Sequence, residues 1–179
     1  MNDFRVSLLP AGASAEPAVL ARLSDLVNEV YAVAEKGLWL DEATRTSTAE
    51  IAATAGAGEI AVARQGRHIV GCVRVRALDE RTAEFGMLAA DPAHRGRGVG
   101  RDLVAFAERH ALDGGREVMR LEVLTPREWT HPSKEFLAAW YSRLGYRRTG
   151  VEPVEDFYPA LAPLLATPCD LVVYRKALI

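Results

Sequence analysis

The sequence predicts an α/β fold in which helices pack on a single mixed β-sheet. Three observations predict it. Segments with helical spacing of apolar residues alternate with short strand-like segments along the 179 residues, three strand-like segments follow one another before the middle of the chain, and no linker or internal repeat divides it. Because 49% of the residues are apolar, the chain can bury one sizeable core. We expect a single domain over residues 1–179 with the element order β-α-α-β-β-β-α-β-α-β-β.

The first half of the chain is predicted to contain one strand, two helices and an antiparallel meander. Pro10 closes the first strand, Gly37 breaks the first helix, and the turn at 56–58 ends the second helix. Turn residues at 65–66 and 79–80 then separate three alternating or β-branched runs. The predicted elements are a strand at 4–9, helices at 15–34 and 46–55, and strands at 59–64, 69–76 and 82–90.

The second half of the chain is predicted to alternate between helix and strand. Apolar residues return to a helical period from Val99, and the glycines at 114–115 stop that helix. Alternating residues at 118–124 predict a strand, and residues 171–176 predict the last one. Between them lies a helix that ends at Gly145, and the proline-punctuated segment 153–168 is left unassigned. The apolar face of this helix is formed by Phe136, Leu137, Trp140, Tyr141 and Leu144.

Charge and residue counts argue against several classes of function. A formal net charge of −2 disfavours binding to nucleic acid or to an anionic membrane, because excess positive charge drives both interactions. Cys72 and Cys169 have neither metal-ligand nor disulfide spacing, and the histidines have no ligand spacing, so no metal site is expected. No apolar run has the length of a membrane span or a signal-peptide core. We expect a soluble, cytoplasmic protein.

The segment 88–101 carries the clearest functional signal. It ends a strand, forms a glycine-rich turn and opens a helix. Backbone N–H groups at a helix N-terminus have no intrahelical partner and lie at the positive end of the helix dipole, so they bind phosphate oxygens well. Glycines allow the phosphate to approach closely, and arginines add positive charge. The segment contains Gly96, Gly98 and Gly100 together with Arg95, Arg97 and Arg101, and it is predicted to bind a diphosphate.

Two better-known phosphate loops do not fit this segment. The G-x-x-x-x-G-K-[ST] loop requires a lysine followed by serine or threonine after the glycines, and none is present. The dinucleotide G-x-G-x-x-G spacing does not fit either. That loop also belongs to a parallel βαβ unit, whereas residues 88–101 follow a predicted meander.

At these residues the sequence resembles the GNAT superfamily of acyl-CoA-dependent N-acyltransferases. Residues 95–100 match its signature Arg/Gln-x-x-Gly-x-Gly/Ala, and residues 140–146 resemble its late helix, which ends in Tyr-x-x-Leu-Gly-Phe/Tyr. The resemblance covers nearly the whole chain and is weakest before residue 59 and at 153–168. It implies a sheet splayed between its fourth and fifth strands, with acetyl-CoA in the gap. The residues implied to bind acetyl-CoA are Leu88, Ala89, Ala90, Arg95, Gly96, Arg97, Gly98, Val99, Gly100 and Arg101.

The resemblance implies a direct attack of a primary amine on the thioester within a ternary complex. Cys72 lies in an apolar run and no G-x-S-x-G elbow exists, so no acyl-enzyme nucleophile is evident. A lysine-like amine is almost wholly protonated at pH 7, and some group must accept its proton. Glu84 stands where several family members carry a general-base glutamate acting through water. The strand period of two places it on the face of Leu88 and Ala90. Alternatively, it is a solvated carboxylate or an ion-pair partner of Arg74 or Arg76.

Tyr141 matches the general-acid tyrosine of the family, which protonates the departing thiolate of coenzyme A. A phenol with a pKa near 10 suits this step, although the apolar stripe of its helix also predicts a core aromatic residue at this position. Many family members have a cofactor-contacting asparagine seven residues earlier. Here that position is Lys134, and Ser133 is the candidate to replace the asparagine.

The resemblance places the acceptor wall in the first two helices and the loop that joins them. Tyr31, Glu35 and Trp39 would suit a cationic or aromatic amine there, although an aromatic pair at a helix junction is more often explained by packing. The acceptor itself stays open among small molecules and peptides, and acetyl is the default acyl group. A homodimer is compatible with the resemblance.

Two rival functions remain from other classes. One is a non-catalytic acyl-CoA-binding module that regulates a partner protein. The other is a nucleic-acid binder that uses the three arginines of residues 95–101 as a basic patch, which the net charge and the strand-turn-helix context disfavour.

Overall fold

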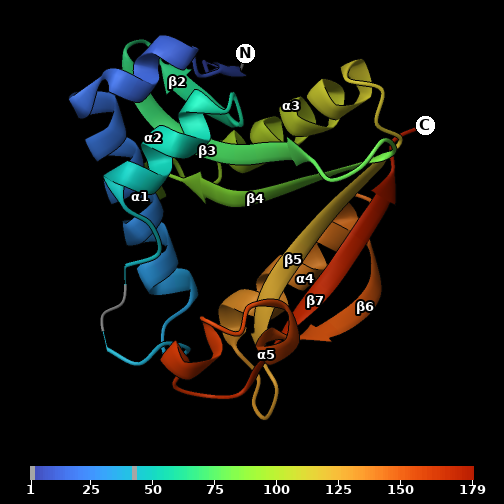
Figure 1. Cartoon of the computed structure of the whole chain (residues 1–179). Helices are drawn as coiled ribbons and strands as arrows, with labels where there is room; N and C mark the ends of the chain where they lie inside the picture. The colour runs from blue at the N-terminus through green and yellow to red at the C-terminus, as the bar shows by residue number, and fades with distance from the viewer. Residues whose placement is uncertain (1–2, 42–43) are drawn as a thin grey trace.

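The computed structural model describes residues 3–41 and 44–179 and shows a seven-stranded sheet covered by helices (Figure 1). The predicted element order is confirmed, with a short additional helix before the last strand. The strands are β1 (Arg5–Leu8), β2 (Ile60–Gln65), β3 (His68–Ala77), β4 (Thr82–Ala90), β5 (Val118–Pro126), β6 (Arg147–Pro153) and β7 (Cys169–Ala177). The helices are α1 (Pro17–Ala34), α2 (Thr48–Gly56), α3 (Val99–Asp113), α4 (Pro132–Arg143) and α5 (Val154–Phe157). No helix of this described part is long and apolar enough to cross a membrane.

The sheet has the strand order β1-β2-β3-β4-β5-β7-β6, and its strands separate in the middle. β4 and β5 form a parallel pair that begins at Thr82 and Val118 and ends at Glu84 and Arg120. Beyond this point the two strands diverge (Figure 1). This is the splay between the fourth and fifth strands that the resemblance implies.

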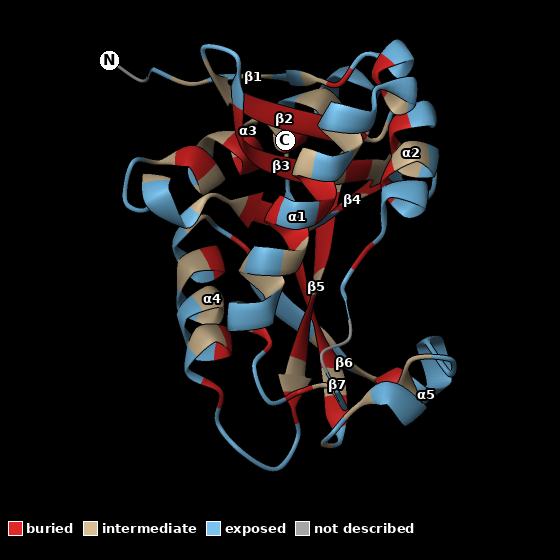
Figure 2. Cartoon of the chain, turned by 90° about the vertical axis from the view of Figure 1, so that its left-hand side faces the viewer, coloured by how far each residue is buried: buried red, intermediate tan, exposed pale blue. Residues whose placement is uncertain are grey.

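Helices cover both faces of the sheet, and each face has its own core. On one face α3 and α4 pack through residues such as Leu103 and Tyr141 against Phe85 and Met119 of the strands. On the other face α1 and α2 pack against β2, β3 and β4. Figure 2 shows the buried residues concentrated along the strands and on the sheet-facing sides of these helices. The splay between β4 and β5 therefore connects two separately packed faces of the sheet.

Gly71 lies where α3 packs closely against the sheet. A Cβ atom at this position of β3 would lie 2.7 Å from Val99 Cγ1 and 2.9 Å from Leu103 Cδ1. We expect Gly71→Ala to lower the free energy of unfolding by roughly 1–3 kcal/mol, because such overpacking forces the helix away. Urea unfolding checks this. Gly150→Ala in β6, where a Cβ meets nothing within 4 Å, is the control, and equal unfolding midpoints for the two variants would refute the prediction.

The segment that the sequence left unassigned forms a wall beside the splay. It contains α5 and a short 3₁₀ helix at Ala162–Leu164. Its far end pairs with the chain that follows α1, because Leu40 N–H donates to Leu164 O (2.8 Å) and Ala166 N–H donates to Leu38 O (2.8 Å). The end of α1 and this segment thus lie together beside the splay between β4 and β5, on one face of the sheet.

Candidate functional site

The glycine-rich loop between β4 and α3 has the backbone shape that phosphate binding requires. Gly96 and Gly98 adopt left-handed φ angles of 77° and 88°, and a Cβ atom at either position would meet nothing within 4 Å. Gly98 is the N-cap of α3, and it has no side chain that could cap the first turn. The N-cap side-chain bond that commonly satisfies such N–H groups is therefore absent at Gly98, and Arg95 and Arg101 are exposed beside this turn.

Three other loop positions contribute differently. Val99 is buried in the core, and a Cβ at Gly100 would contact Trp140 of α4 at 3.5 Å, so only their backbone groups are left for a ligand. Arg97 lies over the Phe4 ring at 5.0 Å and 3.9 Å from Asp3. The loop thus lies close to α4 at Gly100 and is held by Arg97, between the two open glycines, to the residues that precede β1.

A β-bulge in β4 changes which residues face the splay. Met87 has a positive φ of 51°, and the register with β3 shifts here. Beyond it, Leu88 and Ala90 pack on the α3 and α4 face with Phe85, whereas Ala89 packs on the α1 and α2 face. The prediction that Glu84 shares a face with Leu88 and Ala90 is wrong, because the bulge inserts one extra residue and reverses the alternation.

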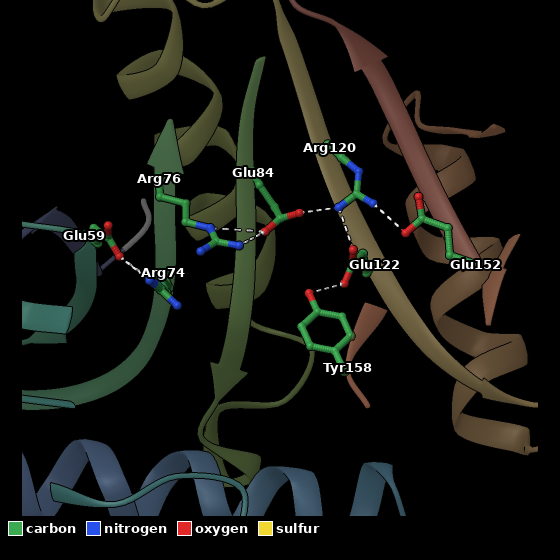
Figure 3. Close-up of polar contacts among 8 residues, drawn as sticks. All are labelled: Glu59, Arg74, Arg76, Glu84, Arg120, Glu122, Glu152 and Tyr158. Carbon is green, nitrogen blue, oxygen red and sulfur yellow. Dashed lines mark hydrogen bonds and ion pairs between the residues drawn. The ribbon is translucent and has the colours of Figure 1, made fainter. Parts of the chain in front are cut away.

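Glu84 lies at the last residue pair before β4 and β5 part, in a network of ion pairs (Figure 3). Its carboxylate accepts hydrogen bonds from Arg76 (2.9 Å) and from Arg120 of β5. The predicted alternative of an ion pair with Arg76 is therefore observed, whereas Arg74 pairs with Glu59 at 2.6 Å. These contacts fix the carboxylate at the apex of the splay.

Arg120 is the centre of this network and was not predicted from the sequence. It donates to Glu122 at 2.7 Å and to Glu152 at 3.0 Å in addition to Glu84. Burial lowers the pKa of Arg120, but the bonds and charges of Glu122 and Glu84 outweigh burial and raise it overall. Glu122 also accepts a hydrogen bond from the Tyr158 hydroxyl at 3.0 Å. The alternation of Arg120 and Glu122 was visible in the sequence, but only the β4–β5 pairing brings them to Glu84.

A cavity of about 240 Å³ fills the splay and is lined from both faces of the sheet. It brings together Glu84, Tyr141 and the acceptor candidates Tyr31, Glu35 and Trp39, which the sequence separates by up to 110 positions. A second cavity of about 460 Å³ lies between α1, the β2–β3 turn and residues 91–94. It is larger but contains none of these residues. The cavity in the splay is therefore the candidate active site.

Two tyrosines, Tyr31 and Tyr141, line this cavity from α1 and α4. Burial raises the pKa of Tyr141 well above its usual range, and the nearby Tyr31 raises it further. The Tyr141 ring contacts Phe85 and Trp140, so the predicted core-aromatic interpretation is also observed. Burial raises the pKa of Tyr31 to about 12, while Arg45 and the Leu88 backbone N–H lower it. Tyr31 and Leu88 thus interact where both line the cavity.

Lys134 stands where many family members have an asparagine that contacts the cofactor. Here its side chain forms a buried ion pair. Its Nζ lies 3.2 Å from Glu35 Oε2, and the two side chains are only 6% and 3% exposed. Burial lowers the pKa of Lys134, and the Glu35 carboxylate opposes that shift. Glu35 also accepts a bond from Trp39 Nε1 (3.4 Å) and lies 3.7 Å from Arg45. Ser133 is the second residue of α4, and its N–H donates to His131 Nδ1.

Comparisons with known proteins agree with this architecture. An aminoglycoside 6'-N-acetyltransferase complexed with coenzyme A superposes with a TM-score of 0.74 at 17% identity, over 98% of this chain and 97% of that one. A putative acetyltransferase from Salmonella typhimurium with its cofactor acetyl-CoA gives 0.67 at 17% identity, covering 99% and 95%. A putative phosphinothricin N-acetyltransferase gives 0.66 at 17% identity, covering 98% and 99%. These likenesses establish the fold.

Sequence comparison identifies the family. A search of curated proteins gave no match. Residues 56–148, however, match the acetyltransferase (GNAT) domain, and this range includes the meander, the glycine-rich loop and Tyr141. The chain therefore belongs to the GNAT acetyltransferase family.

Proposed function

We propose that this protein transfers an acetyl group from acetyl-CoA to a primary amine by direct attack within a ternary complex. The observation that carries the proposal is the cavity between β4 and β5. It places the carboxylate of Glu84 and the phenol of Tyr141 around one small space that both faces of the sheet line. Two substrates entering from opposite faces could meet there without a covalent intermediate.

Acetyl-CoA fits the side of the splay that faces α3 and α4. The open glycines Gly96 and Gly98 and the uncapped first turn of α3 would hold the pyrophosphate, with Arg95, Arg97 and Arg101 supplying positive charge. The backbone of Leu88, Ala89 and Ala90 would bind the pantetheine arm. The N–H of Leu88, which already influences the Tyr31 hydroxyl inside the cavity, would polarise the thioester carbonyl.

Glu84 is the proposed general base and Tyr141 the proposed general acid. Glu84 would remove a proton from the acceptor ammonium through water, and the amine nitrogen would then attack the carbonyl carbon. When the C–S bond breaks, Tyr141 would protonate the thiolate of coenzyme A, and its phenolate would take the second proton that the nitrogen loses as the amide forms. The fully buried Cys72, whose pKa burial raises to about 12, is unsuited to act as a nucleophile, which supports direct attack.

The names of two solved neighbours support a small amine acceptor. One is an aminoglycoside 6'-N-acetyltransferase and the other a putative phosphinothricin N-acetyltransferase. Their identity to this chain is 17%, so the chemistry of the acceptor has to come from the cavity itself.

Substitution of the two proposed catalytic residues tests the mechanism. We expect Glu84→Gln to lower kcat for acetyl transfer by about 10²- to 10⁴-fold. Tyr141→Phe should lower kcat by roughly 10²-fold without changing the profile below pH 10. The pH profile should stay unchanged because the raised pKa of Tyr141 keeps its phenol protonated throughout that range.

Tyr174→Phe is the matched control, because Tyr174 is buried with its ring 6.2 Å from that of Tyr141 yet does not line the cavity. Rates should be measured from pH 6 to 10 by release of free coenzyme A. Unchanged turnover in both catalytic variants would contradict the assigned roles. Binding of acetyl-CoA without turnover of any amine would favour the non-catalytic module instead.

A further inference from the structure

Among the described residues, one wall of the cavity in the splay has excess positive charge. Glu35 is a single carboxylate shared by two cations, Lys134 at 3.2 Å and Arg45 at 3.7 Å, and all three residues line the cavity. Lys134 is buried, but the Arg45 side chain is 39% exposed and lies over the Tyr31 ring at 5.2 Å. Because one carboxylate cannot neutralise two cations, this wall can accept a second carboxylate from a ligand.

The strand side of the cavity has the opposite charge (Figure 3). Among the described residues, Glu84, Glu122 and Glu152 share two guanidinium groups, those of Arg76 and Arg120. Two of these carboxylates, Glu84 and Glu122, line the cavity. The neighbouring Arg147 and Arg175 are exposed to solvent outside it, where screening weakens their effect. This side therefore has an excess of negative charge that suits an ammonium group.

The surfaces between the two charged regions are mainly apolar. Trp39 follows α1, and the segment after β6 contributes Val154, Tyr158 and Leu161. The volume of about 240 Å³ is smaller than the roughly 300–1,000 Å³ typical of sites for drug-sized ligands. The cavity therefore suits one small molecule with an apolar side chain.

We infer that the acceptor is a free amino acid with an apolar side chain, an inference that rests on the proposed acetyl transfer. Its ammonium group faces Glu84 and Glu122, its carboxylate faces Arg45 and Lys134, and its side chain contacts Trp39. Glu84 takes one ammonium proton through water. The nitrogen forms the new C–N bond, the C–S bond of acetyl-CoA breaks, and the thiolate takes a proton from Tyr141. The nitrogen then gives its second proton to the Tyr141 phenolate, which restores the phenol. The products are an N-acetyl amino acid and free coenzyme A.

The test compares leucine with leucinamide and isopentylamine, which lack the carboxylate but retain the amine and the side chain. Steady-state rates with saturating acetyl-CoA give kcat/KM for each compound. We expect leucine to exceed both analogues by about 10- to 100-fold, the range of one charge-assisted hydrogen bond. Arg45→Gln should remove most of this preference by lowering the value for leucine alone.

Arg74→Gln is the matched control. Arg74 is also a partly exposed, ion-paired arginine, with 37% of its side chain exposed, but it does not line the cavity. This variant should keep the preference for leucine. Equal rates with leucine and isopentylamine, or an equal loss of preference in both variants, overturns the inference.

Calorimetry separates failure of the inference from failure of the proposed function. Leucine titrated into the protein saturated with free coenzyme A should bind, and isopentylamine should bind more weakly. If acetyl-CoA binds but no apolar amino acid does, the amino-acid acceptor is wrong and acetyl transfer to another amine survives. If acetyl-CoA itself does not bind the folded protein, the proposed function fails.

Discussion

Replacing Gly98 with glutamate is expected to abolish measurable acetyl-CoA binding, with a loss in affinity of about 100-fold or more. Gly98 is the N-cap of α3, has a φ of 88°, and presents open space where a phosphate would approach. A side chain there would occupy that space, and its negative charge would repel the pyrophosphate. Losing two charge-assisted hydrogen bonds of about 1.5–3 kcal/mol each is enough for such an effect.

Gly98→Glu could weaken binding either by straining the backbone or by blocking the phosphate site. A second glycine variant separates these two causes. Gly58 follows α2 with a similar φ of 74° and an equally open Cβ position. Gly58→Glu therefore introduces a comparable strain and the same charge far from the loop in sequence. Calorimetric titration with acetyl-CoA should give wild-type affinity for Gly58→Glu and no resolved binding for Gly98→Glu. Equal affinities in the two variants would exclude the glycine-rich loop as the phosphate site.

Local signals explain the parts of the fold that the sequence predicts well. The strand predicted at 82–90 coincides with β4, and the helix predicted from Val99 ends at Asp113 before the glycines at 114–115. These elements combine a clear hydrophobic period with strong stop signals. The glycine-rich loop could also be predicted from local signals, because its spacing and its position between a strand and a helix are both visible in the sequence.

The geometry of the site depends on contacts that no local pattern contains. The bulge at Met87 reverses the faces of β4, yet Met87 is an ordinary apolar residue in the sequence. Arg120 meets Glu84 and Glu152 across 36 and 32 positions. The segment 153–168 pairs with residues 38–40, which lie far away in the sequence. Such features follow from tertiary structure and could be recognised only once the strands were placed.

Substituting Lys134 is the variant for which we expect the largest effect on stability. Lys134→Met should lower the free energy of unfolding by about 3–5 kcal/mol, because it leaves the carboxylate of Glu35 buried without its nearest cation. The pair joins α4 to the end of α1 across the splay, 99 positions apart, and both side chains are almost completely buried. Urea unfolding measures the loss.

Two further variants show whether burial causes this loss. Arg81→Met breaks an ion pair with Glu117 in which 76% of the arginine side chain is exposed, and it should change stability by only about 0–1 kcal/mol. The double variant Glu35→Gln with Lys134→Met removes both charges, while the introduced glutamine can still accept the bond from Trp39, so it should recover most of the stability. If Lys134→Met were as mild as Arg81→Met, the buried pair would contribute little to stability, and the expectation would be wrong.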